Sequence, residues 1–160
     1  MKTVQILPAP TGAFIDLVRQ FQARLRELNN NPAQPTAEEA RAEAAGYFGA
    51  NRVVFGLELD GKLIGFSALK TEDGVYWLDW LFVDPAHRGF ENASYLFDET
   101  ERYVLARGEE QMYIWVHPDN HAMLKFLKKK GYDVLNLVEV KKVKAQTRAV
   151  VDILGHELRY

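Results

Sequence analysis

The most constraining feature of this sequence is one continuous stretch that runs from Tyr76 to Arg107. It opens with the run YWLDWLFV, which is aromatic and aliphatic enough to predict a buried strand. A turn follows, Asp84 to Gly89, and apolar residues then recur with the spacing of a helix packed on a sheet. A strand, a tight turn and a helix start bring free backbone N–H groups and the helix dipole together, which predicts an anion site.

Composition excludes several classes of function. The chain has 160 residues, and we expect one domain that spans residues 1–160. It has no cysteine, so disulfides, thiolate metal sites and a cysteine nucleophile are excluded. The net charge of −2 gives no overall attraction to nucleic acid or acidic membranes. We find no signal-peptide pattern and no apolar run of membrane-spanning length, so we expect a cytoplasmic protein.

The part of the chain before this stretch predicts one short strand and two helices. The strand is Val4–Leu7, and apolar residues then follow helical spacing over about Gly12–Leu28. Thr36 with Glu39 three residues later forms a capping box, which opens a second helix that ends near Phe48. This second helix is rich in alanine and has a weak apolar face, so we expect it to cover a site rather than build a core.

Around the central stretch the sequence predicts a sheet with one parallel pair. Two strands before it form an antiparallel meander with the Tyr76 strand, and a crossover helix after it makes the next strand parallel to the Tyr76 strand. A helix over about residues 118–131 comes next. The further predicted strands are Arg52–Leu59, Lys62–Lys70, Gln111–Val116, Tyr132–Val140 and a final strand over Ala149–Tyr160 that is broken at Gly155.

Two motifs give the chain a resemblance to the GNAT superfamily of N-acetyltransferases. Residues 83–93, VDPAHRGFENA, are similar to the family pattern V-x-P-x-x-R-G-x-G-x-G/A. Residues 116–132, VHPDNHAMLKFLKKKGY, are similar to V-x-x-x-N-x-x-A-x-x-L/F-Y-x-x-x-G-F. The resemblance implies an α/β (α+β) fold, with a mostly antiparallel mixed sheet, helices on both faces and a central parallel strand pair that splays apart.

The resemblance also implies that the chain uses acetyl-CoA (coenzyme A) as co-substrate and has no metal. The main chain of Leu81, Phe82 and Val83 would bond the acetyl carbonyl and the pantetheine arm. Asn120 would contact the pantetheine side. The pyrophosphate would be held by backbone N–H groups of the residues Arg88, Gly89, Phe90, Glu91, Asn92, Ala93 and Ser94. The guanidinium of Arg88 could also neutralise a phosphate.

Two positions depart from the family pattern. Glu91 stands where the family has a small residue, so its carboxylate would oppose the pyrophosphate, although an acid is also favourable in a first helical turn. Leu127 stands where many members carry a tyrosine that protonates the leaving thiolate. That role is therefore absent from this position.

Asp79 and His117 are the candidate catalytic residues. Acids at or near the position of Asp79 serve as bases in some relatives, and we expect it to share a strand face with Leu81 and Val83. The alternative is a structural carboxylate paired with an arginine or with backbone N–H groups. His117 could act as an acid or base, whereas a zinc site with His121 lacks a third ligand.

The resemblance therefore implies an N-acetyltransferase in which a primary amine attacks acetyl-CoA directly in a ternary complex. The alternative is a non-catalytic relative that binds coenzyme A weakly and acts as a binding module. The acceptor is either a small-molecule amine or a peptide or protein amine, and residues 29–36 with the alanine-rich helix are expected to shape its pocket. No nucleic acid or membrane partner is expected, and a homodimer through the final strand is left open.

Overall fold

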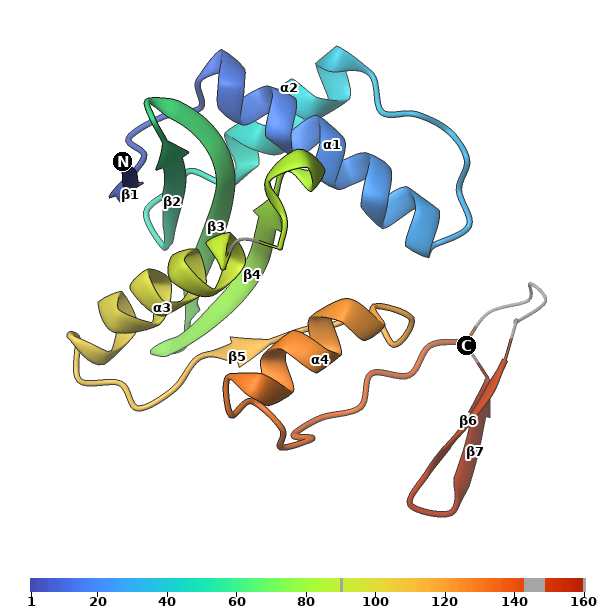
Figure 1. Cartoon of the computed structure of the whole chain (residues 1–160). Helices are drawn as coiled ribbons and strands as arrows, with labels where there is room; N and C mark the ends of the chain where they lie inside the picture. The colour runs from blue at the N-terminus through green and yellow to red at the C-terminus, as the bar shows by residue number, and fades with distance from the viewer. Residues whose placement is uncertain (90, 143–148, 160) are drawn as a thin grey trace. The chain divides into compact units, whose positions relative to one another are not determined.

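The structure is a computed structural model that describes residues 1–89, 91–142 and 149–159. The chain divides into two compact units, Met1–Leu124 and Lys125–Tyr160. Helix α4 (His121–Lys129) begins in the first unit and ends in the second. The other elements of the first unit are β1 (Lys2–Ile6), α1 (Gly12–Leu28), α2 (Ala37–Gly46), β2 (Arg52–Leu59), β3 (Lys62–Glu72), β4 (Val75–Val83), the 3-10 helix η1 (Pro85–His87), α3 (Asn92–Leu105) and β5 (Tyr113–Ile114) (Figure 1).

The five strands of the first unit form one mixed sheet in the order β1-β2-β3-β4-β5. Neighbouring strands are antiparallel except β4 and β5, which run parallel and pair at Trp77 with Tyr113 and at Leu78 with Ile114. The predicted mixed sheet with one parallel pair is therefore confirmed. The strand predicted over Gln111–Val116 is reduced to two residues, and it forms the edge of the sheet.

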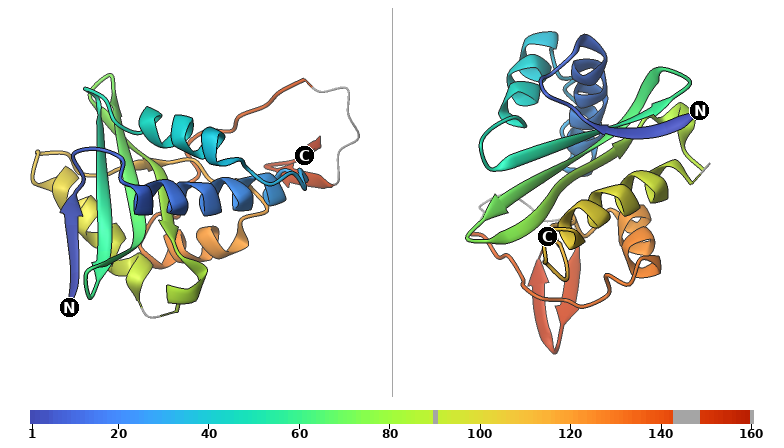
Figure 2. Two further views of the ribbon diagram at one scale, coloured as in Figure 1. Left: turned by 90° about the horizontal axis from the view of Figure 1, so that it is seen from above. Right: turned by 90° about the vertical axis from the view of Figure 1, so that its left-hand side faces the viewer.

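Helices cover both faces of this sheet, as predicted. Figure 2 shows α1 and α2 on one face and α3 on the other. Successive side chains of β3 point to opposite faces of the sheet. Phe66 packs in the core beneath α1, whereas Ser67 Oγ lies 2.6 Å from Thr100 Oγ1 on α3. The core beneath α1 and α2 comprises Leu7, Phe14, Leu17, Val18, Phe21, Ala44, Tyr47, Val54, Phe66, Ala68 and Phe82.

The two N-terminal helices form where the sequence predicts them, and they differ in how firmly they are anchored. Helix α1 starts at its N-cap Thr11, whose hydroxyl accepts a hydrogen bond from Phe14 N, and it buries five side chains. Helix α2 has the predicted capping box of Thr36 and Glu39, but only two alanines of it are buried. Helix α2 is therefore held by its cap more than by the core, as a cover over a site would be.

The ladder between β3 and β4 contains one extra residue in β4. Ala68 pairs with Trp80 and Leu69 pairs with Leu78, so Asp79 has no partner. A β-bulge of this kind bends its strand and increases the local twist. The bulge lies directly after Leu78, the last residue of β4 that pairs with β5. The two parallel strands therefore separate where β4 bends.

The bulge overturns the predicted faces of β4. Simple alternation placed Asp79 with Leu81 and Val83, and placed Leu78 with Trp80 on the opposite face. In the structure Leu78 and Trp80 lie on opposite faces, because their partners on β3 are consecutive residues. Asp79 accompanies Trp80 on the α1 and α2 side. One inserted residue is enough to shift the alternation, and nothing in the sequence marks it.

The second unit contains a hairpin of β6 (Val150–Ile153) and β7 (His156–Arg159). The predicted final strand is therefore two strands, and Gly155 lies in the turn between them with a φ of 85°. The strand predicted over Tyr132–Val140 is wrong: residues 132–142 form neither helix nor strand. A strand needs a pairing partner, which an apolar pattern does not supply. Tyr160 lies outside the described residues.

No helix within the described ranges combines the length and the apolar character needed to cross a membrane.

Candidate active site

The end of β4 has an edge without a strand partner in the described part of the chain, on which the Val83 carbonyl accepts a hydrogen bond from Arg88 Nε. Pairing with β5 stops at Leu78, so the edge of β4 from Asp79 to Val83 has no strand partner among the described residues. On its other side β4 stays paired with β3 as far as Val83, opposite Gly65. A side chain at Gly65 would come within 2.8 Å of the Phe82 carbonyl, which explains the glycine there. The predicted acetyl and pantetheine position on Leu81, Phe82 and Val83 thus coincides with an open strand edge.

The turn after β4 is built by its own side chains. Asp84 Oδ1 accepts a hydrogen bond from Ala86 N at 3.0 Å and starts η1. Gly89 has a φ of 85°, a conformation that favours glycine. Asn92 is 2% exposed, and its Nδ2 donates to the carbonyl of His87 at 2.8 Å. Asn92 therefore ties the turn to the start of α3.

The N-terminus of α3 carries backbone donors without a cap. The first hydrogen bond of the helix is Tyr95 N to Glu91 O, so the N–H groups of Asn92, Ala93 and Ser94 precede the intrahelical ladder. Glu91 occupies the N-cap position and makes no side-chain cap. A helix start with free donors favours an anion, and the predicted binding of the coenzyme A pyrophosphate at this turn stays a prediction. Phe90, also predicted to contribute here, lies outside the described residues.

Glu91 adopts a left-handed backbone conformation, with φ of 57° and ψ of 14°. Residues with a Cβ adopt it at a cost, and glycine adopts it readily. The family pattern has a small residue at this position, and the structure supplies the backbone reason. The side chain of Glu91 is exposed.

Arg88 contacts the strand end and the turn, and its predicted contact with a phosphate stays a prediction. Its Nε donates to the carbonyl of Val83 at 2.9 Å, its backbone N–H donates to Pro85 O, and its guanidinium lies 5.3 Å from the centre of the Phe82 ring. Burial, and then the nearby charge of Arg24, lower the pKa of Arg88. Arg88 thus braces the turn against β4, and its backbone N–H already has Pro85 O as a partner at 3.4 Å.

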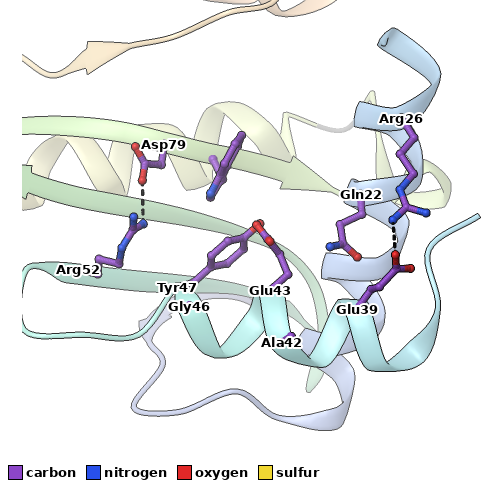
Figure 3. Close-up of a pocket in the computed structure, with 10 residues that line it drawn as sticks. Gln22, Arg26, Glu39, Ala42, Glu43, Gly46, Tyr47, Arg52 and Asp79 are labelled. Carbon is purple, nitrogen blue, oxygen red and sulfur yellow. Dashed lines mark hydrogen bonds and ion pairs between the residues drawn. The ribbon is translucent and has the colours of Figure 1, made fainter. Parts of the chain in front are cut away.

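Asp79 forms an ion pair with Arg52 of β2, with 2.8 Å between Asp79 Oδ2 and Arg52 Nη1 (Figure 3). The side chain of Asp79 is 9% exposed and that of Arg52 is 24% exposed. This is the arrangement that the structural alternative for Asp79 predicts. A catalytic role for Asp79 stays a prediction.

The ion pair lines a cavity of about 610 Å³ between the sheet and the two N-terminal helices. A second ion pair in the lining joins Arg26 Nη2 to Glu39 Oε1 at 2.9 Å. Figure 3 shows that these two pairs come from opposite parts of the lining. The lining residues are Gln22, Arg26, Glu39, Ala42, Glu43, Gly46, Tyr47, Arg52, Asp79 and Trp80.

Tyr47 is the most deeply buried polar side chain of this lining, with 3% exposure. Its hydroxyl lies next to the carboxylate of Glu43 but makes no hydrogen bond of ordinary geometry within the described residues (Figure 3). Burial, and then the charge of Glu43, raise the pKa of Tyr47 well above its usual value. The hydroxyl therefore stays protonated.

The second predicted motif lies in and around the start of α4. His117 Nδ1 accepts a hydrogen bond from Asp119 N at 3.1 Å, and Asn120 Oδ1 accepts one from Met123 N at 3.2 Å. Asn120 thus caps α4, and its predicted contact with pantetheine stays a prediction, as does the role of His117. No group of three metal-ligating side chains forms among the described residues, so His117 and His121 have no third ligand there.

The sequence did not single out five polar members of this pocket: Gln22, Arg26, Glu43, Tyr47 and Arg52. The alanine-rich helix was expected to cover a site, and α2 contributes five of the lining residues if Tyr47 at its C-cap is included. Its weak apolar face was the available signal. Which polar side chains meet depends on the packing of α1 and α2 on the sheet, which no local pattern encodes.

An open strand edge, a glycine turn and an uncapped helix start are features that could hold a nucleotide-linked acyl group. The sequence profile of the acetyltransferase (GNAT) family matches residues 17–132. This protein belongs to that family and is an acyltransferase that uses acetyl-CoA as co-substrate. No curated protein sequence matches the chain.

Solved structures show the same fold at low identity. An aminoglycoside N-acetyltransferase AAC(6')-Iy in complex with CoA is 17% identical, with a TM-score of 0.67, 91% of this chain covered and 96% of that one. A ribosomal-protein-alanine N-acetyltransferase from Brucella melitensis is 16% identical, with a TM-score of 0.65 and coverages of 89% and 100%. The PaiA N-acetyltransferase from Thermoplasma acidophilum, in complex with coenzyme A, is 18% identical, with a TM-score of 0.58 and coverages of 80% and 88%.

Proposed function

We propose that this protein transfers the acetyl group of acetyl-CoA to a primary amine that enters the cavity beside Asp79. The proposal rests on one observation: consecutive residues of β4 line the cavity and form the strand edge where the acetyl group is expected. Asp79 and Trp80 line the cavity, and Leu81 to Val83 form the open edge. At about 3.3 Å per residue, Trp80 is adjacent to Leu81, and Asp79 lies about 13 Å from Val83 along the same strand. An amine in the cavity would therefore be close to the position expected for the acetyl group.

The reaction needs a neutral amine. An amine of the lysine type has a pKa of about 10.4, so deprotonation at pH 7 costs about 4.6 kcal/mol, against about 1 kcal/mol for an α-amine. Asp79 is our candidate base, acting directly or through water from within its ion pair with Arg52. A backbone N–H near Val83 would hold the negative charge that develops on the carbonyl oxygen.

The chain contains no cysteine to form an acyl-enzyme, which agrees with direct attack of the amine in a ternary complex. The proton of the attacking amine would leave through the cavity, toward Asp79. Leu127, which is 5% exposed, cannot donate a proton to the leaving thiolate. That proton would then come from water or from another side chain.

Coenzyme binding is tested by thermal unfolding with acetyl-CoA. A ligand at a hundred times its Kd adds about 2.7 kcal/mol of stability, which is a rise of roughly 5–10 °C for a chain of this size. Turnover is then measured as thiol release with a panel of amines, which includes a peptide N-terminus. Absence of any thermal shift with millimolar acetyl-CoA would overturn the proposal.

The second candidate function is a non-catalytic relative that acts as a binding module. Glu91 and Leu127 favour it, because one places a carboxylate beside the expected pyrophosphate and the other removes a family proton donor. Coenzyme binding without thiol release for any amine would support this second candidate. Thiol release with any amine would exclude it.

A further inference from the structure

The cavity lining carries more acid than base. Arg26 and Arg52 are each held by one carboxylate, Glu39 and Asp79 respectively. Glu43 also lines the cavity and has no ion-pair partner among the described residues. A half-buried carboxylate without a cation attracts one, because water solvates it less well there than at the surface.

Two buried oxygens lie in the same part of the lining. Gln22 Oε1 is shielded from solvent and has no hydrogen-bond partner in the described part of the chain; the Tyr47 hydroxyl is shielded too, and its one polar neighbour, Glu43, does not bond it with ordinary geometry. Buried polar atoms without partners are rare in folded proteins, because each loses its hydrogen bonds to water without replacement. In Figure 3 the side chain of Glu43 on α2 lies next to that of Tyr47 at the C-cap of α2, and Gln22 of α1 follows along the lining between Glu43 and Arg26.

All three groups can accept hydrogen bonds from a ligand. Glu43 and Gln22 Oε1 accept hydrogen bonds, and the hydroxyl of Tyr47 can also accept one. An ammonium group offers three donors and no acceptor, and its charge complements Glu43. A carboxylate or phosphate ligand would instead be repelled by Glu43.

We infer that Gln22, Glu43 and Tyr47 form a subsite for a second cationic group of the acceptor, so that the substrate is a diamine or a larger polyamine-like molecule. The inference rests on the proposed function, since the first amine is the one that is acetylated. The subsite would hold the distal ammonium while the reacting amine reaches β4. The cavity volume of about 610 Å³ admits an acceptor that spans both positions.

The test compares α,ω-diamines of three to six carbons with monoamines of the same chain length. For the wild type we expect kcat/KM with the best diamine to exceed that of its matched monoamine by about tenfold or more, the range of a charge-assisted hydrogen bond. In Glu43→Gln the ratio should fall to about one. Glu38→Gln is the matched control, because Glu38 lies on the same helix, is exposed and is absent from the lining.

Tyr47→Phe tests the role of the Tyr47 hydroxyl separately. Because the hydroxyl makes no hydrogen bond of ordinary geometry within the described residues, its removal should leave the melting temperature equal or higher, while the diamine binds several-fold more weakly. A lower melting temperature would show that the hydroxyl has a structural partner, and it would remove Tyr47 from the subsite.

A wild-type ratio near one, or a ratio that survives Glu43→Gln, would overturn the inference while leaving amine acetylation intact. If no amine is acetylated, calorimetric titration of the diamine into the wild type and into Glu43→Gln compares their affinities for the diamine. This comparison tests the subsite without any catalytic activity. Weaker binding to Glu43→Gln supports the subsite even then. Equal binding, or no binding to either protein, overturns it.

Discussion

Substitutions at Glu91 test both the backbone conformation and the electrostatics of the turn that we propose holds the coenzyme. Its left-handed conformation, with φ of 57°, costs a residue with a Cβ about 1–2 kcal/mol. Glycine avoids that cost but loses more backbone freedom on folding, and this loss offsets about 0.5–1 kcal/mol of the gain in stability. We therefore expect Glu91→Gly to stabilise the ligand-free protein by about 1 kcal/mol. For a chain of this length the melting temperature should rise by about 2–4 °C.

The charge of Glu91 has a separate effect on the coenzyme. A carboxylate about 6 Å from one phosphate charge costs about 3 kcal/mol at an effective dielectric of 20 and about 0.7 kcal/mol at the value of water. Since the side chain of Glu91 is exposed, the lower figure applies. It corresponds to about threefold in the Kd of acetyl-CoA.

Glu91→Gln separates the two effects, because it keeps the Cβ and removes the charge. We expect it to tighten acetyl-CoA binding by about threefold at low salt, and by less at 0.5 M salt, without raising the melting temperature. Glu91→Gly should do both. Calorimetry measures the first effect and thermal unfolding the second. The backbone argument fails if Glu91→Gly is no more stable than Glu91→Gln, and the electrostatic argument fails if the glutamine variant binds acetyl-CoA as the wild type does.

The ion pairs of the cavity give two further predictions. Removing either partner of a buried pair costs about 3–5 kcal/mol, and we expect Asp79→Asn and Arg52→Gln each to lose stability near the lower end of this range. If Asp79 is also the base, Asp79→Asn alone should remove the dependence of kcat on pH; equal kinetic losses in both variants would assign Asp79 a structural role only. The amide of Thr36, and then Arg26, hold the pKa of Glu39 below its ordinary value of 4.5. Glu39→Gln should therefore be less stable than the wild type at pH 7, and the difference should disappear as the pH falls below 4.5; a difference that persists at pH 3 would contradict this account.

The local signals of the sequence predicted the first unit well. Helical spacing and caps gave α1 and α2, because a cap is a bond between residues three apart and depends on nothing distant. The meander and the parallel crossover followed from turn residues and connection lengths. The prediction failed at Tyr132–Val140, where an apolar pattern was taken for a strand although pairing is a long-range property.

The candidate site could be predicted only in part. The coenzyme turn lies in one continuous segment, so its glycine and its helix start were visible. The ion pair of Arg52 and Asp79 joins residues 27 positions apart, and the grouping of Gln22 with Tyr47 depends on how two helices lie on the sheet. Side chains that meet in this way leave no periodic pattern in the sequence.

The bulge at Asp79 is one extra residue of β4, so deleting that residue should change how β4 pairs with its neighbours. If Asp79 were deleted, Ala68 would still face Trp80 and Leu69 would still face Leu78, so an uninterrupted ladder would form with every other pair in place. The bend that accompanies the bulge would be lost, and β4 could follow β5 beyond Leu78. The point at which β4 stops pairing with β5 thus coincides with a single-residue insertion in β4.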